Sequence, residues 1–143
     1  MELRSVEELM DLLYACRGTR SGPGRGTDLH QHALRTAALL RRRRPADKEL
    51  QAAGLVQAIG PLLGPGDRAG LVADAVRPLL GERVAGLVRA RGAGGGPADD
   101  DLLRLRQAAE EGHGTPFDAG VLEDWRTVLE LLAARNSRLG AVD

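Results

Sequence analysis

The sequence predicts an all-α fold. Apolar residues recur at helical spacing along most of the chain, and no segment shows the alternating pattern of a half-buried strand. Only three residues are aromatic, whereas 43% are hydrophobic, so Leu, Val and Ala must build most of the core. Those residues suit closely packed helices better than sheets. We expect one domain over residues 1–143, a compact helical bundle of about seven helices.

The first two helices have clear start and stop signals. Ser5 and Glu8 stand three apart, as in a capping box, and predict a helix after Ser5. A Gly- and Pro-rich stretch ends that helix. Thr27 or Asp28 is expected to cap the second helix, which ends in the RRRR run before Pro45. Cations are favourable at a helix C-terminus and Pro stops a helix, so this run has a local explanation. The alternative is a patch for an anion or RNA.

The third helix is expected to be the central one. Asp47 should cap it, and it runs to about Leu63 with apolar residues on nearly all sides. A helix of that kind is buried on most sides. Gln57 is its only polar side chain after Gln51. Because buried amides are hydrogen-bonded, Gln57 should have a partner if it is buried.

Three shorter helices are expected in the second half of the chain. The first spans Asp67 to Leu80, with a bend at Pro78, and the next lies in GERVAGLVRAR. Gly92 to Pro97 is a loop by composition. The third of these helices spans Asp99 to Glu111.

The last helix is predicted to open at TPFD. Thr115 would cap it, Pro116 would take the first helical position, and Asp118 would complete a capping box. Asn136 suits a left-handed C-terminal end. The expected apolar stripe consists of Val121, Leu122, Trp125, Val128, Leu129 and Leu132.

The composition excludes several functional classes. Twenty basic and twenty acidic residues give a formal net charge of zero, so a nucleic-acid partner is not expected. No apolar run reaches the roughly 18–20 residues that span a bilayer, and the N-terminus lacks the order of a signal peptide. We therefore expect no membrane association and a cytoplasmic location. The lone Cys16 excludes an intramolecular disulfide and a Cys-rich metal site. The near absence of Lys beside many Arg is typical of a GC-rich bacterial genome.

Five short segments between residues 28 and 91 follow one another in a distinctive order. They are HALRTA from His32, AGLVQAIGP from Ala53, RAGLVA from Arg68, LLG from Leu79 and VAGLVRAR from Val84. In that order they resemble the HD-domain superfamily of metal-dependent phosphohydrolases. They are most similar to its small branch of phosphonate-cleaving mixed-valent di-iron oxygenases. The resemblance implies an HD-like helical core, with looser similarity toward the C-terminus.

The chain departs from this family at the metal ligands. A two-metal centre needs several imidazoles and a bridging carboxylate. The resemblance aligns His32 with the first metal-ligating His, and no other ligand is kept. It therefore implies that the metal site is lost. We expect no metal and no cofactor, and neither metal-dependent phosphohydrolase nor oxygenase activity. The other ligand positions of the family fall on Gln57, Ala58, Pro61, Arg68 and Arg91.

The residues at these positions form the candidate site. Arg presents a planar fork that suits a carboxylate or phosphate. The alternative is that the Arg side chains fill the old cavity by pairing with an internal acid such as Asp74 or Glu82. His32 is either a satisfied, half-buried histidine near the core or a pocket residue that acts as acid, base or donor. The candidate ligand-binding residues are His32, Gln57, Arg68 and Arg91.

Other histidines and glycines are expected to be structural. His30 and His32 point roughly 200° apart on a helix and cannot chelate one ion together. His30 is expected at the surface, and His113 between two glycines in a turn. The glycines at 22–26 and 92–96 do not match a phosphate-binding loop, which has a strand before it and a helix after it.

The leading hypothesis is a pseudoenzyme that keeps the HD fold. Its former active-site cavity would bind a small polar or anionic metabolite or support a partner protein. A first alternative is a metal-independent biosynthetic enzyme, a cyclase, isomerase or lyase, with His32 as acid–base group and Gln57 and the arginines orienting substrate. A second alternative is a helical homodimer interaction module. Convergence of the four candidate residues on one cavity would favour binding or catalysis, and a packed interior would favour the module.

Overall fold

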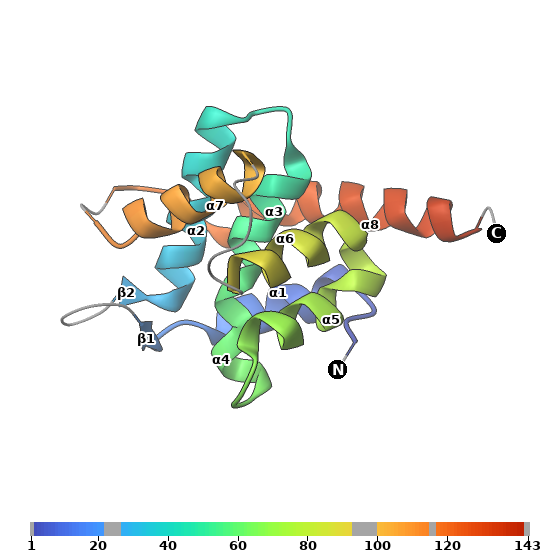
Figure 1. Ribbon diagram of the computed structural model, residues 1–143, viewed down its shortest axis with the longest axis horizontal. Coiled ribbons are helices and arrows are strands. Elements are labelled where there is room, and N and C mark those ends of the chain that lie inside the picture. Colours follow the sequence, from blue (N-terminus) through green and yellow to red (C-terminus); the bar gives the residue numbers. More distant parts are fainter. Residues whose placement is uncertain (1, 22–26, 93–99, 115–116, 142–143) are drawn as a thin grey trace.

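The all-α prediction is confirmed by the structure, a computed structural model that describes residues 2–21, 27–92, 100–114 and 117–141 (Figure 1). The helix predicted over residues 48–63 is one bent unit. It consists of α3 (Lys48–Val56), the 3-10 turn η1 (Gln57–Ile59) and α4 (Gly60–Leu63), which follow one another without a break. Counted as one, this unit and the six other α-helices of the described residues give the expected seven.

Helix α3 lies in the middle of the bundle (Figure 1). All of its residues from Leu50 to Val56 are buried, which confirms the prediction of a buried central helix. It packs against α2, α6, α7 and α8. In the described part of the chain no helix is long and apolar enough to cross a membrane. The other α-helices are α1 (Val6–Ala15), α2 (Leu29–Arg43), α5 (Arg68–Leu80), α6 (Glu82–Gly92), α7 (Asp100–Glu111) and α8 (Arg126–Ala141).

Four predicted helix starts are confirmed by side-chain caps. In each, a side-chain oxygen accepts a hydrogen bond from a backbone N–H three residues further on. The Glu8 carboxylate, however, does not return to Ser5. It accepts instead from the backbone N–H of Arg4 at 2.9 Å. The four caps are Ser5, Asp28, Asp47 and Asp67, with oxygen–nitrogen distances of 3.2, 3.1, 3.1 and 3.0 Å.

One short strand pair was not predicted. Strand β1 (Arg20–Ser21) pairs in antiparallel fashion with β2 (Thr27–Asp28), directly before α2. Two residues are too few for an apolar and polar alternation, so the sequence pattern carries no signal for them.

Helices α2 and α3 approach closely at Gly54. A Cβ at this position would stand 2.6 Å from Leu40 Cδ1 and 3.1 Å from Thr36 Cγ2. Real Cβ atoms do not come that near a packed methyl group, so any side chain would push the two helices apart. Gly54 therefore fixes how α3 sits against α2, which carries His32.

The predicted start of the last helix was wrong. Thr115 and Pro116 lie outside the described residues, and residues 117–121 are not helical. Asp118 accepts from the N–H of Gly120 at 2.9 Å, and Gly120 has a φ of +81°, so the chain turns here instead of entering a helix. Helical structure begins with the 3-10 turn η2 (Leu122–Trp125) and continues into α8.

Two further residues near the C-terminus differ from expectation. Val121, placed in the apolar stripe, is 58% exposed because it precedes the helical region. Asn136 does not end a helix but lies inside α8. Its side-chain amide donates to the carbonyl of Pro78 at 2.8 Å and so ties α8 to α5.

All four arginines of the run 41–44 contact a partner. These tertiary contacts favour a structural role for the run over an anion or RNA patch, and Arg41, Arg42 and Arg43 also form the last turn of α2, as the local explanation expects. Arg41 lies over the ring of Trp125, which is fully buried, at 4.7 Å from the ring centroid. The other contacts join Arg42 to the ring of Phe117, Arg43 to Glu111, and Arg44 to Asp100 and Asp101.

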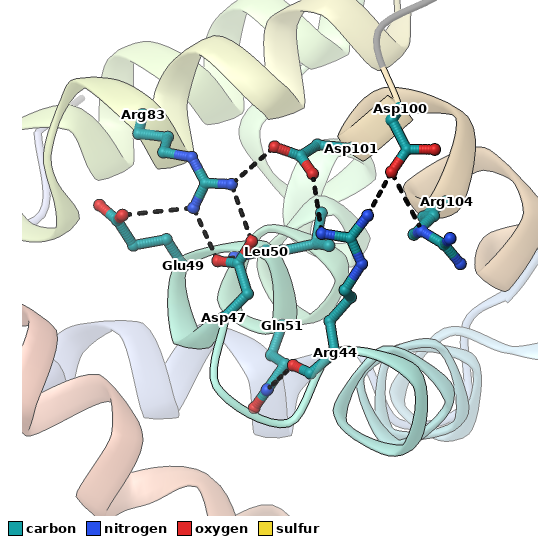
Figure 2. Close-up of polar contacts among 9 residues, drawn as sticks. All are labelled: Arg44, Asp47, Glu49, Leu50, Gln51, Arg83, Asp100, Asp101 and Arg104. Carbon is teal, nitrogen blue, oxygen red and sulfur yellow. Dashed lines mark hydrogen bonds and ion pairs between the residues drawn. The ribbon is translucent and has the colours of Figure 1, made fainter.

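A network of ion pairs joins the ends of four helices (Figure 2). Arg83 on α6 donates to both carboxylate oxygens of Asp47 at 2.7 and 2.8 Å, to Glu49 at 3.3 Å and to Asp101 at 2.9 Å. Arg44 at the end of α2 shares Asp101. The hydrogen bonds from Arg83 are the main cause that lowers the pKa of Asp47. The network therefore holds the start of α7 against α2, α3 and α6.

Candidate functional site

The four candidate residues line one cavity of about 400 Å³. His32 comes from α2, Gln57 from η1, Arg68 from the first turn of α5 and Arg91 from the last turn of α6. They are far apart in the sequence, and η1 links their elements, since it contacts both α2 and α5. The structure thus brings together every residue that the sequence singled out for a ligand site.

Gln57 contradicts the expectation that it would have a hydrogen-bond partner. Its side-chain Nε2 and Oε1 are both buried, and neither has a partner among the described residues. Gln51, six residues earlier, donates to the carbonyl of Arg44 at 2.8 Å (Figure 2). It also donates to the carbonyl of Pro45 at 3.3 Å. The difference follows from position, because Gln51 faces the end of α2 and Gln57 faces a cavity. An unpartnered buried group costs about 1–3 kcal/mol.

Arg91 is a half-buried cation without a counter-ion among the described residues. Its Nε is buried and has no hydrogen-bond partner there. Burial lowers the pKa of Arg91, and repulsion by Arg106 lowers it further. The two acids considered as partners pair elsewhere. Asp74 and Glu82 both bind Arg77, at 2.9 and 3.1 Å. The alternative in which these two acids neutralise the cavity arginines is therefore wrong.

The first turn of α5 forms one edge of the cavity. Arg68 is exposed there. Asp67, beside it, is the only acidic residue among the described residues that line the cavity. Its carboxylate caps α5 by accepting from the N–H of Gly70 at 3.0 Å. Gly60 allows α4 to approach this turn, since a Cβ there would stand 3.1 Å from the Cβ of Arg68.

His32 is both a satisfied buried histidine and a cavity residue. It is 6% exposed, and its Nε2 lies 2.6 Å from the carbonyl oxygen of Ala109. A carbonyl only accepts, so Nε2 carries the hydrogen and Nδ1 is left as an acceptor. Burial lowers the pKa of His32 to about 4, with smaller contributions from His113, Arg91 and Arg35. The imidazole is therefore neutral at neutral pH.

His113 belongs to the site, although the sequence placed it only in a turn. It does lie in the turn after α7, but its ring stacks on that of His32 with centroids 3.9 Å apart and 13° between the planes. Its Nδ1 is 3.2 Å from Thr27 Oγ1. Gly112 permits this contact, because a Cβ there would stand 3.0 Å from His32 Cδ2 and from Thr36 Oγ1. No local pattern links two residues so distant in the sequence.

His30 and Cys16 lie in the core and not in the cavity. The surface position predicted for His30 was wrong, since it is 3% exposed. Its Nδ1 is 2.8 Å from the carbonyl of Leu13, and its ring stacks on Tyr14, so α1 covers it. Burial raises the pKa of the Cys16 thiol to about 11, which keeps it protonated and unreactive.

Among the described residues, the donors around the cavity do not assemble into a metal centre. Across residues 2–21, 27–92, 100–114 and 117–141, no group of three or more His, Cys, Asp or Glu side chains is placed to hold a metal ion. No protein-family model matches the chain. No curated protein sequence matches it either.

Proposed function

We propose that this protein is a degenerate HD-domain-like binding protein whose cavity holds a small polar or anionic metabolite. The resemblance assigns six positions of the chain to metal ligands of the family. All six line the same cavity. They come from α2, η1, α4, α5 and α6, so their convergence does not follow from local sequence. This convergence supports both the alignment and a site at the former metal centre. The six are His32, Gln57, Ala58, Pro61, Arg68 and Arg91.

The unpartnered polar atoms of Gln57 and Arg91 carry the proposal. Five buried side-chain nitrogen or oxygen atoms lack a partner among the described residues, and three of them belong to these two cavity residues. Folded proteins bond nearly all such groups. A ligand in the cavity would supply the missing partners. A structural module would fill the same space with apolar side chains, and a cavity of about 400 Å³ is within the range of ligand sites.

The properties of His32 favour a binding function of the cavity over a function in which His32 is an acid–base catalyst. A general base works best with a pKa near the working pH. The pKa of His32 is lowered to about 4, and its Nε2–H is engaged by the carbonyl of Ala109. His32 is thus a weak base whose Nδ1 serves as a fixed hydrogen-bond acceptor. The homodimer interaction module would be favoured by a packed interior at the site. The structure has a cavity there instead, so this hypothesis has less support.

Calorimetric titration of the purified protein with small carboxylates, phosphates and neutral polar compounds tests the proposal. Native mass spectrometry of the protein as purified detects a retained ligand. We expect at least one anionic compound to bind, and Arg91→Met to weaken it by about tenfold or more. Arg89→Met is the matched control, because Arg89 lies on the same helix but pairs with Asp74 outside the cavity. Equal binding by the two variants, or two metal ions per chain, would contradict the proposal.

A further inference from the structure

The cavity presents two kinds of polar group to a ligand. Arg91 offers a buried cationic N–H, and Arg68 adds positive charge nearby. Gln57 offers a neutral amide, and His32 offers an imidazole nitrogen. A ligand that satisfies only the cation leaves the neutral groups unbonded. The identity of the ligand is therefore constrained by both kinds of group.

The neutral groups require a ligand that donates hydrogen bonds. Gln57 Oε1 can only accept a hydrogen bond. The same holds for Nδ1 of His32, because Nε2 carries the hydrogen. Gln57 Nε2 can only donate. A carboxylate or phosphate has acceptor oxygens alone and would face the two acceptors without bonding them. The planar amide of Gln57 is matched by a group with an N–H and a C=O side by side, as in a lactam, a primary amide or a ureide.

The charges that line the cavity favour a ligand with one negative charge, because Asp67 offsets Arg68 and leaves Arg91. The Arg91 guanidinium is half-buried, stands near Arg106 and has no carboxylate partner among the described residues. One planar guanidinium matches one carboxylate in charge and in shape. Burial strengthens this attraction, because the cavity screens charge less than water does.

Resting on the proposed function, we infer that the ligand class is a small carboxylate that also carries an amide-type N–H and C=O edge. The carboxylate pairs with Arg91, and the N–H and C=O of the edge bond Oε1 and Nε2 of Gln57. A second N–H, which a primary amide or a ureide carries, donates to Nδ1 of His32. This separates the ligand from simple carboxylates, which lack the edge, and from neutral amides, which lack the charge.

Three small probes test this assignment by isothermal titration calorimetry on the full chain. Pyroglutamate carries both a lactam edge and a carboxylate. Cyclopentanecarboxylate keeps the ring and the carboxylate, and 2-pyrrolidinone keeps the lactam alone. Pyroglutamate should bind about tenfold or more tighter than either analogue, because each analogue leaves buried groups unbonded.

Two cavity variants assign each preference to its residue. Gln57→Leu should remove the preference for pyroglutamate over cyclopentanecarboxylate. Arg91→Met should remove the preference over 2-pyrrolidinone, and Arg89→Met should keep both. Equal affinity of pyroglutamate and cyclopentanecarboxylate for the unmodified protein overturns this inference and leaves anion binding intact. No binding by pyroglutamate also overturns it, and the broader titration of metabolites then decides the proposed function separately.

Discussion

Replacing Gln57 by Leu is expected to stabilise the protein without ligand. Leu has a similar volume but no polar atoms, so the variant removes two buried groups that have no partner among the described residues. Each such group costs about 1–3 kcal/mol. Gln57 is only half-buried, so we expect a net gain of about 1–2 kcal/mol. The entropy of unfolding for this length is about 0.3 kcal/mol per kelvin, so Tm should rise by about 3–7 °C.

Gln51→Leu is the matched control and should have the opposite sign. Gln51 lies on the same bent helix and is 1% exposed. Its amide satisfies the carbonyls of Arg44 and Pro45 after the end of α2. Removing it takes this donor from the carbonyl of Pro45, at a cost of about 1–3 kcal/mol, whereas the carbonyl of Arg44 keeps the backbone N–H of Asp47 at 3.1 Å. Tm should fall by about 3–10 °C.

The comparison is made by thermal and urea unfolding, followed by far-UV circular dichroism. Protein should be refolded from denaturant first, since a retained ligand would stabilise the unmodified chain by mass action. If Gln57→Leu lowers Tm as Gln51→Leu does, the Gln57 amide is bonded in the folded protein. That result would remove the observation on which the proposed ligand site depends.

Three further predictions concern pH, packing and the ion-pair network. The pKa of His32 is about 4 when folded and 6.5 when unfolded, so its contribution to stability is complete above pH 6.5 and falls by about 3 kcal/mol as pH drops to 4. The free energy of unfolding, measured in urea above pH 6.5 and at pH 4, should therefore not show this decrease in His32→Gln. Gly112→Ala should cost about 1–3 kcal/mol in the same assay, because its Cβ meets His32 and Thr36. Gly86→Ala, with no atom within 4 Å of its new Cβ, should not destabilise. Arg83→Met should lower Tm at neutral pH, where Asp47 is ionised and its ion pair with Arg83 stabilises the fold. Because Arg83 lowers the pKa of Asp47, the substitution should have less effect once the pH falls below the ordinary pKa of Asp47 and this carboxylate is protonated. An effect of Arg83→Met that does not depend on pH would contradict this.

The helix starts could be predicted from the sequence because their causes are local. Each of these caps accepts a hydrogen bond from the backbone N–H three residues further on, so the sequence spacing alone identifies it. Examples are Asp28, Asp47 and Asp67. The same reasoning failed at Asp118, where two local structures compete. Gly120 can adopt a positive φ, so the Asp118 side chain closes a turn instead of capping a helix.

Polar residues with distant partners could not be placed by local pattern. His30 is buried because α1 folds over it and offers the carbonyl of Leu13. Asn136 bonds the carbonyl of Pro78, which lies on another helix. In each case tertiary contact overrides the preference that the residue type suggests. The spacing of apolar residues predicts which face of a helix is buried, but it does not predict which backbone carbonyl a buried polar side chain will contact.

The candidate site was assembled by the family resemblance and not by periodicity. Gln57, Arg68 and Arg91 carry no common local signal, and their shared cavity arises from the packing of η1, α5 and α6. His113 was missed as a site residue because it follows the last of the segments that carry the resemblance. Its place depends on Gly112, which lets the turn after α7 reach the ring of His32.

The single tryptophan makes the protein its own optical probe. Trp125 lies in η2, fully buried beneath the guanidinium of Arg41, and it does not line the cavity. Its fluorescence therefore reports whether η2 is docked on α2, and it should shift to longer wavelength as that contact opens to water. Filling the cavity should leave the emission unchanged. One chromophore thus separates loss of the fold from ligand binding in a single titration.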